Sequence, residues 1–173
     1  MSKSELESLQ QECERLAAEL VQLCSERNLT VATAESLTAG MVSSTIAAVP
    51  GASSVLNGAA VTYTNAVKER LLGVSEDTIA RVTEVSAEVA LQMAQGAADL
   101  FVSDLAASLT GYAGPGGGTA DNPVGTVYLG LVSPNCSSTR HCRFDGDRQI
   151  VRVKATREAL SWLLESAQAV SLA

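Results

Sequence analysis

The sequence has a single histidine, His141, among its 173 residues. A catalytic triad with histidine as its base would depend on His141, and no recognisable motif surrounds that residue. The four cysteines include no CxxC pair, whereas zinc sites need four ligands at characteristic spacing. We therefore expect no metal and no cofactor, and we expect the thiols to be unpaired and reduced: Cys13, Cys24, Cys136 and Cys142.

Basic residues are also in the minority. The chain has 12 Lys and Arg against 19 Asp and Glu, a formal charge of −7. This balance argues against non-specific nucleic-acid binding, which needs clustered positive charge, although a few local cations suffice for an anionic small molecule. No apolar run approaches the ~20 residues of a membrane span, and the polar segment 1–15 does not resemble a secretory signal. We expect a cytoplasmic protein with no nucleic-acid or membrane partner.

Aromatic residues make up only 3% of the chain, whereas hydrophobic residues as a whole make up 46%. Alanine, valine and leucine must therefore fill the core, and such small side chains allow helices to approach a sheet closely. The length suits one domain.

Hydrophobic periodicity and turn signals divide the chain into helices and strands. Helices are predicted over 3–27, 40–49, 65–73 and 148–169, with a short helix opened by Ser75 and a long one opened by Ser86. Strands are predicted over 29–34, 55–64, 102–110, 124–132 and 137–144. This order is typical of an α/β protein, a single three-layer α/β/α domain over 1–173 with a mixed, mostly parallel sheet.

A polar cluster, Glu35-Ser36-Leu37-Thr38, lies between the first predicted strand and the helix that begins at Gly40. Ligands of open α/β sheets bind at such strand ends, and helix-start N–H groups can hold an anion. Ser36 is well placed there as a nucleophile. Capping of the helix by Ser36 or Thr38 is the alternative, because capping is the commonest role of such residues.

A second cluster combines Tyr63 with Lys68, five residues later at the start of a helix. A serine can be activated by a lysine that burial or nearby cations keep neutral. A solvated lysine on a helix face is the alternative.

Two further features suit a phosphate. Glycines recur through the loop 111–118, where bare backbone amides could approach an anion, although neither a Walker motif nor a Rossmann fingerprint is present. Arg148 and Arg152 are four residues apart on one face of the last predicted helix. A flexible surface turn and a solvated arginine pair are the respective alternatives.

Taken together, these clusters resemble the carboxy-terminal domain of the CinA family. Each motif alone is weak, but five in the same order are specific, and the resemblance covers about residues 5–168. The matching segments are Ala34-Glu35-Ser36-Leu37-Thr38-Ala39-Gly40, Val61-Thr62-Tyr63-Thr64-Asn65 with Lys68, Thr110 to Thr119, Pro123-Val124-Gly125-Thr126-Val127, and Phe144-Asp145-Gly146-Asp147-Arg148 with Arg152.

The resemblance implies a nicotinamide mononucleotide deamidase, an amidohydrolase of pyridine-nucleotide salvage that releases ammonia from the carboxamide. By the matching motifs, Ser36 is expected to be the nucleophile and Lys68 its general base, with Tyr63 orienting or sharing the proton. Helix-start N–H groups near Thr38 and Gly40 would hold the oxyanion. The glycine loop and one or both arginines would hold the nucleotide's phosphate and ribose: Thr110, Gly111, Gly114, Gly116, Gly117, Arg148 and Arg152. Family members tend to form homo-oligomers, so we expect one here.

The sequence departs from the family pattern in two places. Leu37 and Ala39 replace the usual Cys and Gly, and the methyl group of Ala39 is expected beside the oxyanion site. The stretch Val82-Thr83-Glu84-Val85 replaces a His-Gly-Ala-Val-like one, so substrate fit could differ. Two other functions remain open: a non-enzymatic regulatory or assembly module of the same fold, and an amidase for a different nucleotide. The amino-terminal domain of longer family members, which resembles molybdopterin-binding proteins, has no counterpart in the sequence.

Overall fold

The structure is a computed structural model that describes residues 3–170; the ends of the predicted domain, 1–2 and 171–173, lie outside the described residues. Within residues 3–170, the order of helices and strands is the predicted one. The elements are α1 (Lys3–Arg27), β1 (Val31–Glu35), α2 (Met41–Ala47), a 3₁₀ turn (Ala52–Ser54), β2 (Leu56–Val61), α3 (Asn65–Leu72), α4 (Glu76–Val82), α5 (Ala87–Phe101), β3 (Leu105–Gly111), β4 (Thr126–Ser133), β5 (Cys136–Arg143) and α6 (Arg148–Ala169).

Two predicted strand ends are wrong by three residues: the strand expected over 55–64 ends at Val61, and the second error lies at the start of β3. The strand expected from Val102 begins only at Leu105. Val102 instead ends α5 in the left-handed conformation, with φ 49°, and its side chain is 82% exposed. The apolar run through these residues therefore contains the end of one element and the start of the next, which hydrophobicity alone does not separate.

The five strands form one mixed sheet in the order β2-β1-β3-β4-β5. β1 pairs in parallel with β2 and with β3, and the pairs β3–β4 and β4–β5 are antiparallel. Only β4 therefore runs against the other four strands. The consequence for function is that β1, β2 and β3 all end at the same edge of the sheet, so the polar residues that follow them meet there.

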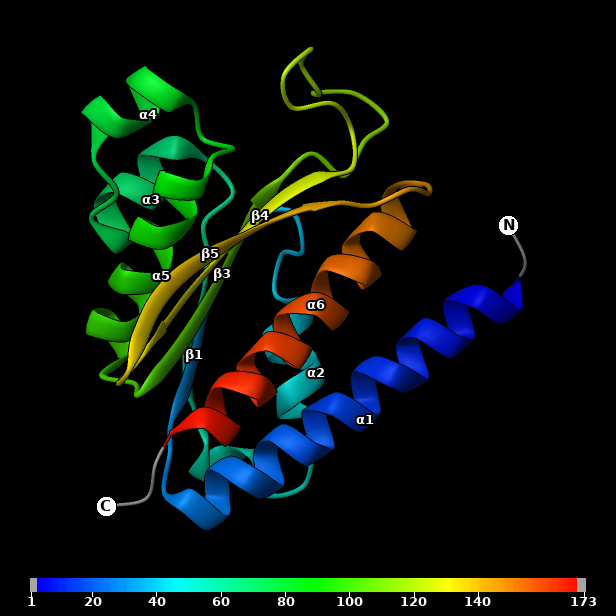
Figure 1. Cartoon of the computed structure of the whole chain (residues 1–173), viewed down its shortest axis with the longest axis vertical. Helices are drawn as coiled ribbons and strands as arrows, with labels where there is room; N and C mark the ends of the chain where they lie inside the picture. Colours follow the sequence, from blue (N-terminus) through cyan, green and yellow to red (C-terminus); the bar gives the residue numbers. More distant parts are fainter. Residues whose placement is uncertain (1–2, 171–173) are drawn as a thin grey trace.

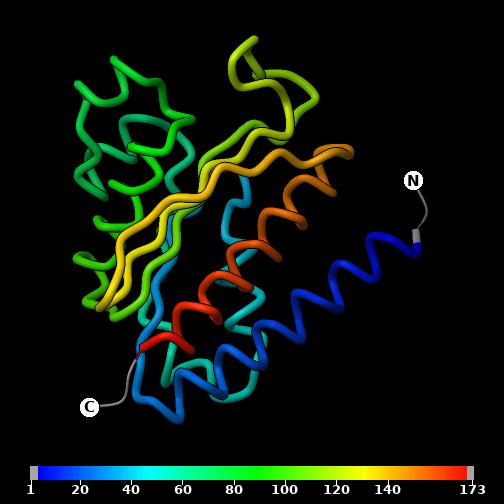
Figure 2. Tube along the Cα trace, in the orientation of Figure 1, coloured from blue at the N-terminus to red at the C-terminus, as the bar shows by residue number. Residues whose placement is uncertain are grey.

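Helices cover both faces of the sheet, as the predicted three layers require. In Figure 1, α3, α4 and α5 lie on one side of the strands, and α1, α2 and α6 lie on the other. The trace in Figure 2 shows α1 and α6 side by side, although they come from opposite ends of the chain. No helix within residues 3–170 is both long enough and apolar enough to cross a membrane.

The core is split by the sheet into two apolar clusters. Val31 of β1 belongs to the cluster under α1, α2 and α6, whereas Ala32 and Ala34 belong to the cluster under α5. This alternation is the two-residue period of a strand buried on both faces. All four cysteines are free, and burial raises the pKa of the Cys13 and Cys24 thiols to about 11, so these two behave as core residues.

Small residues allow the helices to approach one another closely, as the composition predicted. A Cβ atom on Gly96 of α5 would lie 2.0 Å from the carbonyl oxygen of Leu72, the last residue of α3. Since any side chain would push the two helices apart, Gly96 fixes the distance between α5 and α3. The position of Lys68, which lies on α3, depends on this contact.

Glu35, the last residue of β1, is a fully buried carboxylate that joins this strand to α2. It accepts hydrogen bonds from the backbone N–H groups of Gly40, Val42 and Ser43 at 2.9–3.1 Å. A fourth bond, of 3.1 Å, comes from the Thr33 hydroxyl. The first N–H groups of a helix have no acceptors within it and carry partial positive charge, so the carboxylate satisfies both needs. The residues between Glu35 and Gly40 are thereby confined to a tight turn.

We expect Glu35→Gln to lower the free energy of unfolding by about 2–5 kcal/mol. The amide –NH₂ group would face N–H donors where the wild-type carboxylate has an acceptor, and each buried donor left unpaired costs about 1–3 kcal/mol. Urea unfolding followed by circular dichroism measures the loss. Glu76→Gln, an exposed glutamate in the first turn of α4, is the matched control and should stay within about 0.5 kcal/mol. Equal stability of the two variants would contradict an anchoring role for Glu35.

Candidate active site

One pocket of about 230 Å³ lies where β1, β2 and β3 end. Residues from all four predicted clusters line it. They are Ser36, Tyr63, Lys68, Thr110, Gly111, Gly114, Gly116 and Arg148, and the structure adds Leu37, Glu84, Val85, Tyr112 and Ala113. The parallel strands explain this convergence, because they bring segments that are far apart in sequence to one edge of the sheet.

Ser36 follows directly after β1 and is half-buried. Its backbone N–H donates to the carbonyl of Leu109 on β3 (3.0 Å), which fixes the residue at the strand end. Within residues 3–170 its hydroxyl makes no hydrogen bond. The Oγ atom of Ser36 is therefore held at the pocket wall without being committed to a structural role.

Lys68 is buried, with 1% of its surface exposed, and lies on α3. Its Nζ atom donates to the carbonyl oxygen of Thr62 at 3.0 Å. Burial lowers the pKa of Lys68 below its ordinary value of 10.5, and the carboxylate of Glu84 opposes this effect in part. The neutral amine that a general base requires is thus more populated than in a solvated lysine.

Tyr63 and Arg148 form the outer wall of the pocket. The Tyr63 ring is 55% exposed, and its hydroxyl accepts a hydrogen bond from Arg148 Nη2 at 2.8 Å. Arg148 Nη1 donates to the carbonyl of Gly114 at 2.9 Å. The guanidinium at the start of α6 therefore ties the end of β2 to the glycine loop.

The base of the glycine loop is closed by backbone hydrogen bonds. Tyr112 N–H donates to Thr126 O, and Gly125 N–H donates to Tyr112 O. Gly111 continues β3 where a Cβ atom would lie 2.5 Å from the Thr126 carbonyl oxygen, so a side chain there would clash with the neighbouring strand. Gly117 lies farther out, exposed and away from the pocket lining.

Three other predicted site residues also lie outside the pocket lining. The N–H of Gly40, expected to help hold an oxyanion, already donates to Glu35. Thr38 is fully buried, and its Oγ1 makes no hydrogen bond in the part of the chain that the structure describes. Arg152 binds the turn from behind, with Nε donating to Leu37 O (2.9 Å) and Nη2 to Thr38 O (2.7 Å).

Ala39, expected to place a methyl group beside the oxyanion site, is exposed and lies outside the pocket lining. Ala39 has a φ of 52°, in the left-handed region that alanine rarely adopts.

Sequence reasoning missed two polar residues of the pocket. Tyr112 lies within the glycine loop, and its hydroxyl donates to Glu84 Oε1 at 3.3 Å. Burial raises the pKa of Tyr112, and the negative charge of Glu84 adds to the effect. Glu84 lies in the turn between α4 and α5, where no periodic pattern distinguishes it. Its one signal was the departure of Val82-Thr83-Glu84-Val85 from the family pattern.

Within residues 3–170, no three His, Cys, Asp or Glu side chains are placed to hold a metal ion.

Comparisons with known proteins identify the relatives of this chain. The model of the CinA C-terminal domain family matches residues 13–167. The CinA-like protein of Citrifermentans bemidjiense is 47% identical over 150 residues, which cover 87% of this chain and 36% of that protein. The CinA-like protein of Geobacter sulfurreducens is 45% identical over 144 residues, covering 83% and 35%. The chain thus spans about a third of the length of these curated relatives.

Solved structures agree with the sequence match. The competence/damage inducible protein CihA from Agrobacterium tumefaciens is 36% identical, with a TM-score of 0.87 and coverage of 89% of this chain and 94% of that one. The competence damage-inducible protein A (ComA) from Klebsiella pneumoniae is 30% identical, with a TM-score of 0.88 and coverage of 92% and 99%. On the family match, the shared fold and the order of its motifs, the chain belongs to the CinA C-terminal domain family.

Proposed function

We propose that this protein hydrolyses the carboxamide of nicotinamide mononucleotide to nicotinate mononucleotide and ammonia. The observation that carries the proposal is the meeting of an uncommitted serine hydroxyl, Ser36, with a buried lysine of lowered pKa, Lys68, in one pocket. A serine activated by such a lysine is a recognised means of acyl transfer without histidine. The membership of the CinA family supports this choice of substrate over other amides.

In the proposed mechanism, neutral Lys68 removes the proton of the Ser36 hydroxyl as Oγ attacks the carboxamide carbon. The C–N bond then breaks, and the lysine ammonium returns the proton to the leaving nitrogen, which departs as ammonia. Water adds to the ester that remains, with Lys68 again taking a proton. The C–O bond to Ser36 then breaks, the Lys68 ammonium returns its proton to Oγ, and the carboxylic acid product loses its own proton to solvent, which restores serine and neutral lysine.

The oxyanion of the tetrahedral intermediate needs N–H donors that are free. Since Glu35 occupies the N–H of Gly40, the donors must come from earlier in the turn. The N–H groups of Leu37 and Thr38 donate no hydrogen bond within residues 3–170, and Leu37 lines the pocket. We assign the oxyanion to these two groups, which a preorganised turn would present without reorganisation.

The phosphate of the nucleotide is assigned to the outer wall of the pocket. Arg148 is exposed there, and it can exchange its bonds to Tyr63 and Gly114 for a phosphate because a guanidinium has five donors. Exposed glycine amides, such as that of Gly116, lie on the same wall. Arg152 takes no part in this assignment, because its donors hold the carbonyls of Leu37 and Thr38.

Ser36→Ala is expected to abolish ammonia release from nicotinamide mononucleotide while leaving the unfolding midpoint unchanged. The substitution removes the attacking atom but no hydrogen bond of the described structure. A coupled ammonia assay with purified protein measures turnover. Ser44→Ala, an exposed serine on α2 outside the pocket lining, is the matched control and should retain full activity. Full activity of Ser36→Ala would remove Ser36 from the mechanism, and no turnover by folded wild-type protein would refute the substrate.

Lys68→Met is expected to lower kcat by about 10²–10⁴-fold and to raise the free energy of unfolding by about 0.5–2 kcal/mol. The reason is that the buried ammonium opposes folding while its neutral form serves the reaction. For the wild-type protein, kcat/KM should rise with pH through a pKa below 10.5, as the amine loses its proton.

The pH dependence of stability provides a second check on Lys68. Because its pKa is lower in the folded than in the unfolded state, the cost of its burial is fully present below the folded pKa. That cost disappears as pH rises to the unfolded value. The stability gain of Lys68→Met over wild type, measured by urea unfolding, should therefore shrink as pH rises. A gain independent of pH, or a loss at neutral pH, would contradict a buried titrating amine.

A further inference from the structure

Glu84 places a carboxylate in the pocket from the turn between α4 and α5. Glu84 is partly exposed and lines the same pocket as Ser36 and Lys68. Among the described residues that line the pocket, Lys68 and Arg148 are basic and Glu84 is the only acid. The pocket therefore offers one negative charge to a ligand, at a fixed place.

The turn that carries Glu84 is held at three successive carbonyl groups. The Ser86 hydroxyl donates to Thr83 O at 3.1 Å, and the Thr110 hydroxyl donates to Glu84 O at 2.7 Å. The side chain of Asn122 donates to Val85 O at 3.2 Å. The backbone of Glu84 is thus tied both to α5 and to the strand end beneath the pocket, which limits where its carboxylate can lie.

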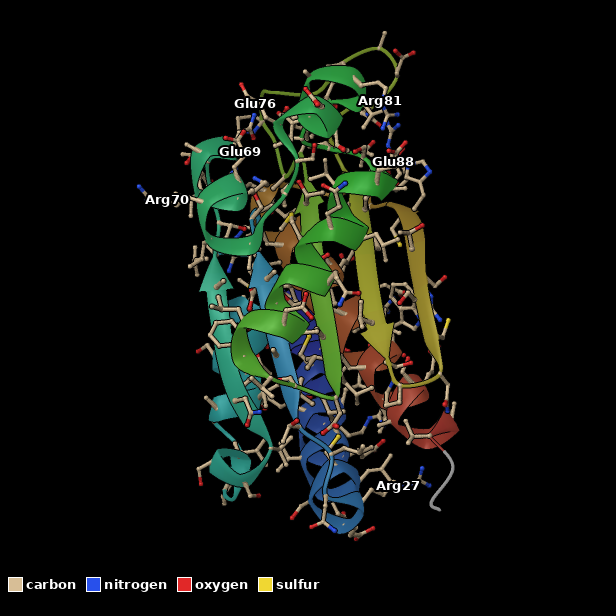
Figure 3. The ribbon with its side chains drawn as sticks, turned by 90° about the vertical axis from the view of Figure 1, so that its left-hand side faces the viewer. Arg27, Glu69, Arg70, Glu76, Arg81 and Glu88 are labelled. Carbon is tan, nitrogen blue, oxygen red and sulfur yellow. The ribbon has the colours of Figure 1, made fainter. Side chains whose placement is uncertain are left out.

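An ion pair spans the same turn from outside. Arg81 on α4 forms two hydrogen bonds with Glu88 in the first turn of α5, at 3.0 and 2.5 Å. Figure 3 shows these two labelled side chains next to each other where α4 meets α5. The helices at both ends of the turn are thus linked to each other, which holds Glu84 in place in the pocket wall.

The carboxylate of Glu84 makes few interactions with the rest of the described protein. Its one hydrogen bond, from the Tyr112 hydroxyl, is 3.3 Å long, beyond the 2.5–3.0 Å typical of O–H···O bonds. No ion pair with Lys68 lies within 4.0 Å among residues 3–170, and the described bond of Lys68 Nζ goes to Thr62 O. Oε2 has no partner in the described structure. A carboxylate with a free oxygen in a partly enclosed pocket is available to a ligand.

We propose that Glu84 is a specificity-determining residue, which selects amides carried on a positively charged pyridinium ring. The inference rests on the proposed function: in nicotinamide mononucleotide the ring nitrogen bonded to ribose carries a positive charge, and the same ring bears the scissile carboxamide. A carboxylate beside the ring attracts that charge, and partial exclusion of water strengthens the attraction. A neutral ring of the same shape gains nothing from it, so the charge of Glu84 separates the two.

The test compares two ligands that differ in ring charge, in the Ser36→Ala background so that binding is measured without turnover. The probes are nicotinamide mononucleotide, whose ring is cationic, and its 1,4-dihydro form, whose ring is neutral, with dissociation constants from isothermal titration calorimetry. Glu84→Gln keeps the shape of the side chain and an acceptor for Tyr112. It should weaken the cationic ligand about tenfold and the neutral ligand by less than about twofold. Glu76→Gln, which removes the same charge outside the pocket, should change neither ligand by more than about twofold.

Other outcomes would either contradict the role of Glu84 or refute the proposed hydrolysis alone. Equal weakening of both ligands would mean that Glu84 only supports the shape of the pocket, and no change would mean that it does not meet the ring. Selective loss of the cation together with no ammonia release by the wild-type protein would refute the hydrolysis and keep the inference. If neither nucleotide binds, 1-methylnicotinamide and nicotinamide replace them. Failure of the protein with Glu84 intact to prefer the 1-methyl cation then overturns the inference.

Discussion

The position of Ser36 depends on one buried charge, the carboxylate of Glu35. A carboxylate without exposure to water must find donors, and it finds three of them at the start of α2. On the other side of the same turn, Arg152 donates to two carbonyls, those of Leu37 and Thr38. The Glu35 carboxylate thus takes N–H groups at the start of α2, and the Arg152 guanidinium takes the C=O groups of Leu37 and Thr38. The Ser36 hydroxyl and the N–H groups of Leu37 and Thr38 are left without a partner among the described residues, and Ser36 and Leu37 line the pocket.

The burial of Lys68 costs stability, in contrast to that of Glu35, whose hydrogen bonds stabilise the fold. Its burial raises the energy of the ammonium, and the fold offers it in return a hydrogen bond to Thr62 O and the distant charge of Glu84. The close contact between Gly96 and Leu72 keeps α3, which carries Lys68, against α5. A lysine held in this way serves proton transfer better than it serves stability. This is the physical reason to assign it the role of base.

The order of helices and strands, the mixed sheet and the gathering of Ser36, Tyr63, Lys68 and Arg148 could be predicted from the sequence. Periodicity gave the elements, and the polar residues lay where strands end, which parallel pairing brings together. The partners of individual side chains could not be predicted in this way. The spacing of Arg152 predicted a phosphate ligand. Its guanidinium instead donates to the carbonyls of Leu37 and Thr38, which lie 115 and 114 positions earlier in the chain. Local spacing does not determine such a tertiary contact. For the same reason, the sequence did not predict that the Gly40 N–H would donate to Glu35.

Two of the four described non-glycine residues with positive φ lie in the turns that carry Ser36 and Glu84: Ala39 at 52° and Thr83 at 67°. By the resemblance to the family motifs, each stands where the pattern has a glycine. A left-handed conformation costs an alanine about 1 kcal/mol, and a β-branched threonine more, so the new side chains oppose these turns. The turns nevertheless persist, because Glu35, Arg152 and the hydroxyls of Ser86 and Thr110 hold them from outside. Since the surrounding hydrogen bonds determine the backbone, the sequence at such a turn can change while the site keeps its shape.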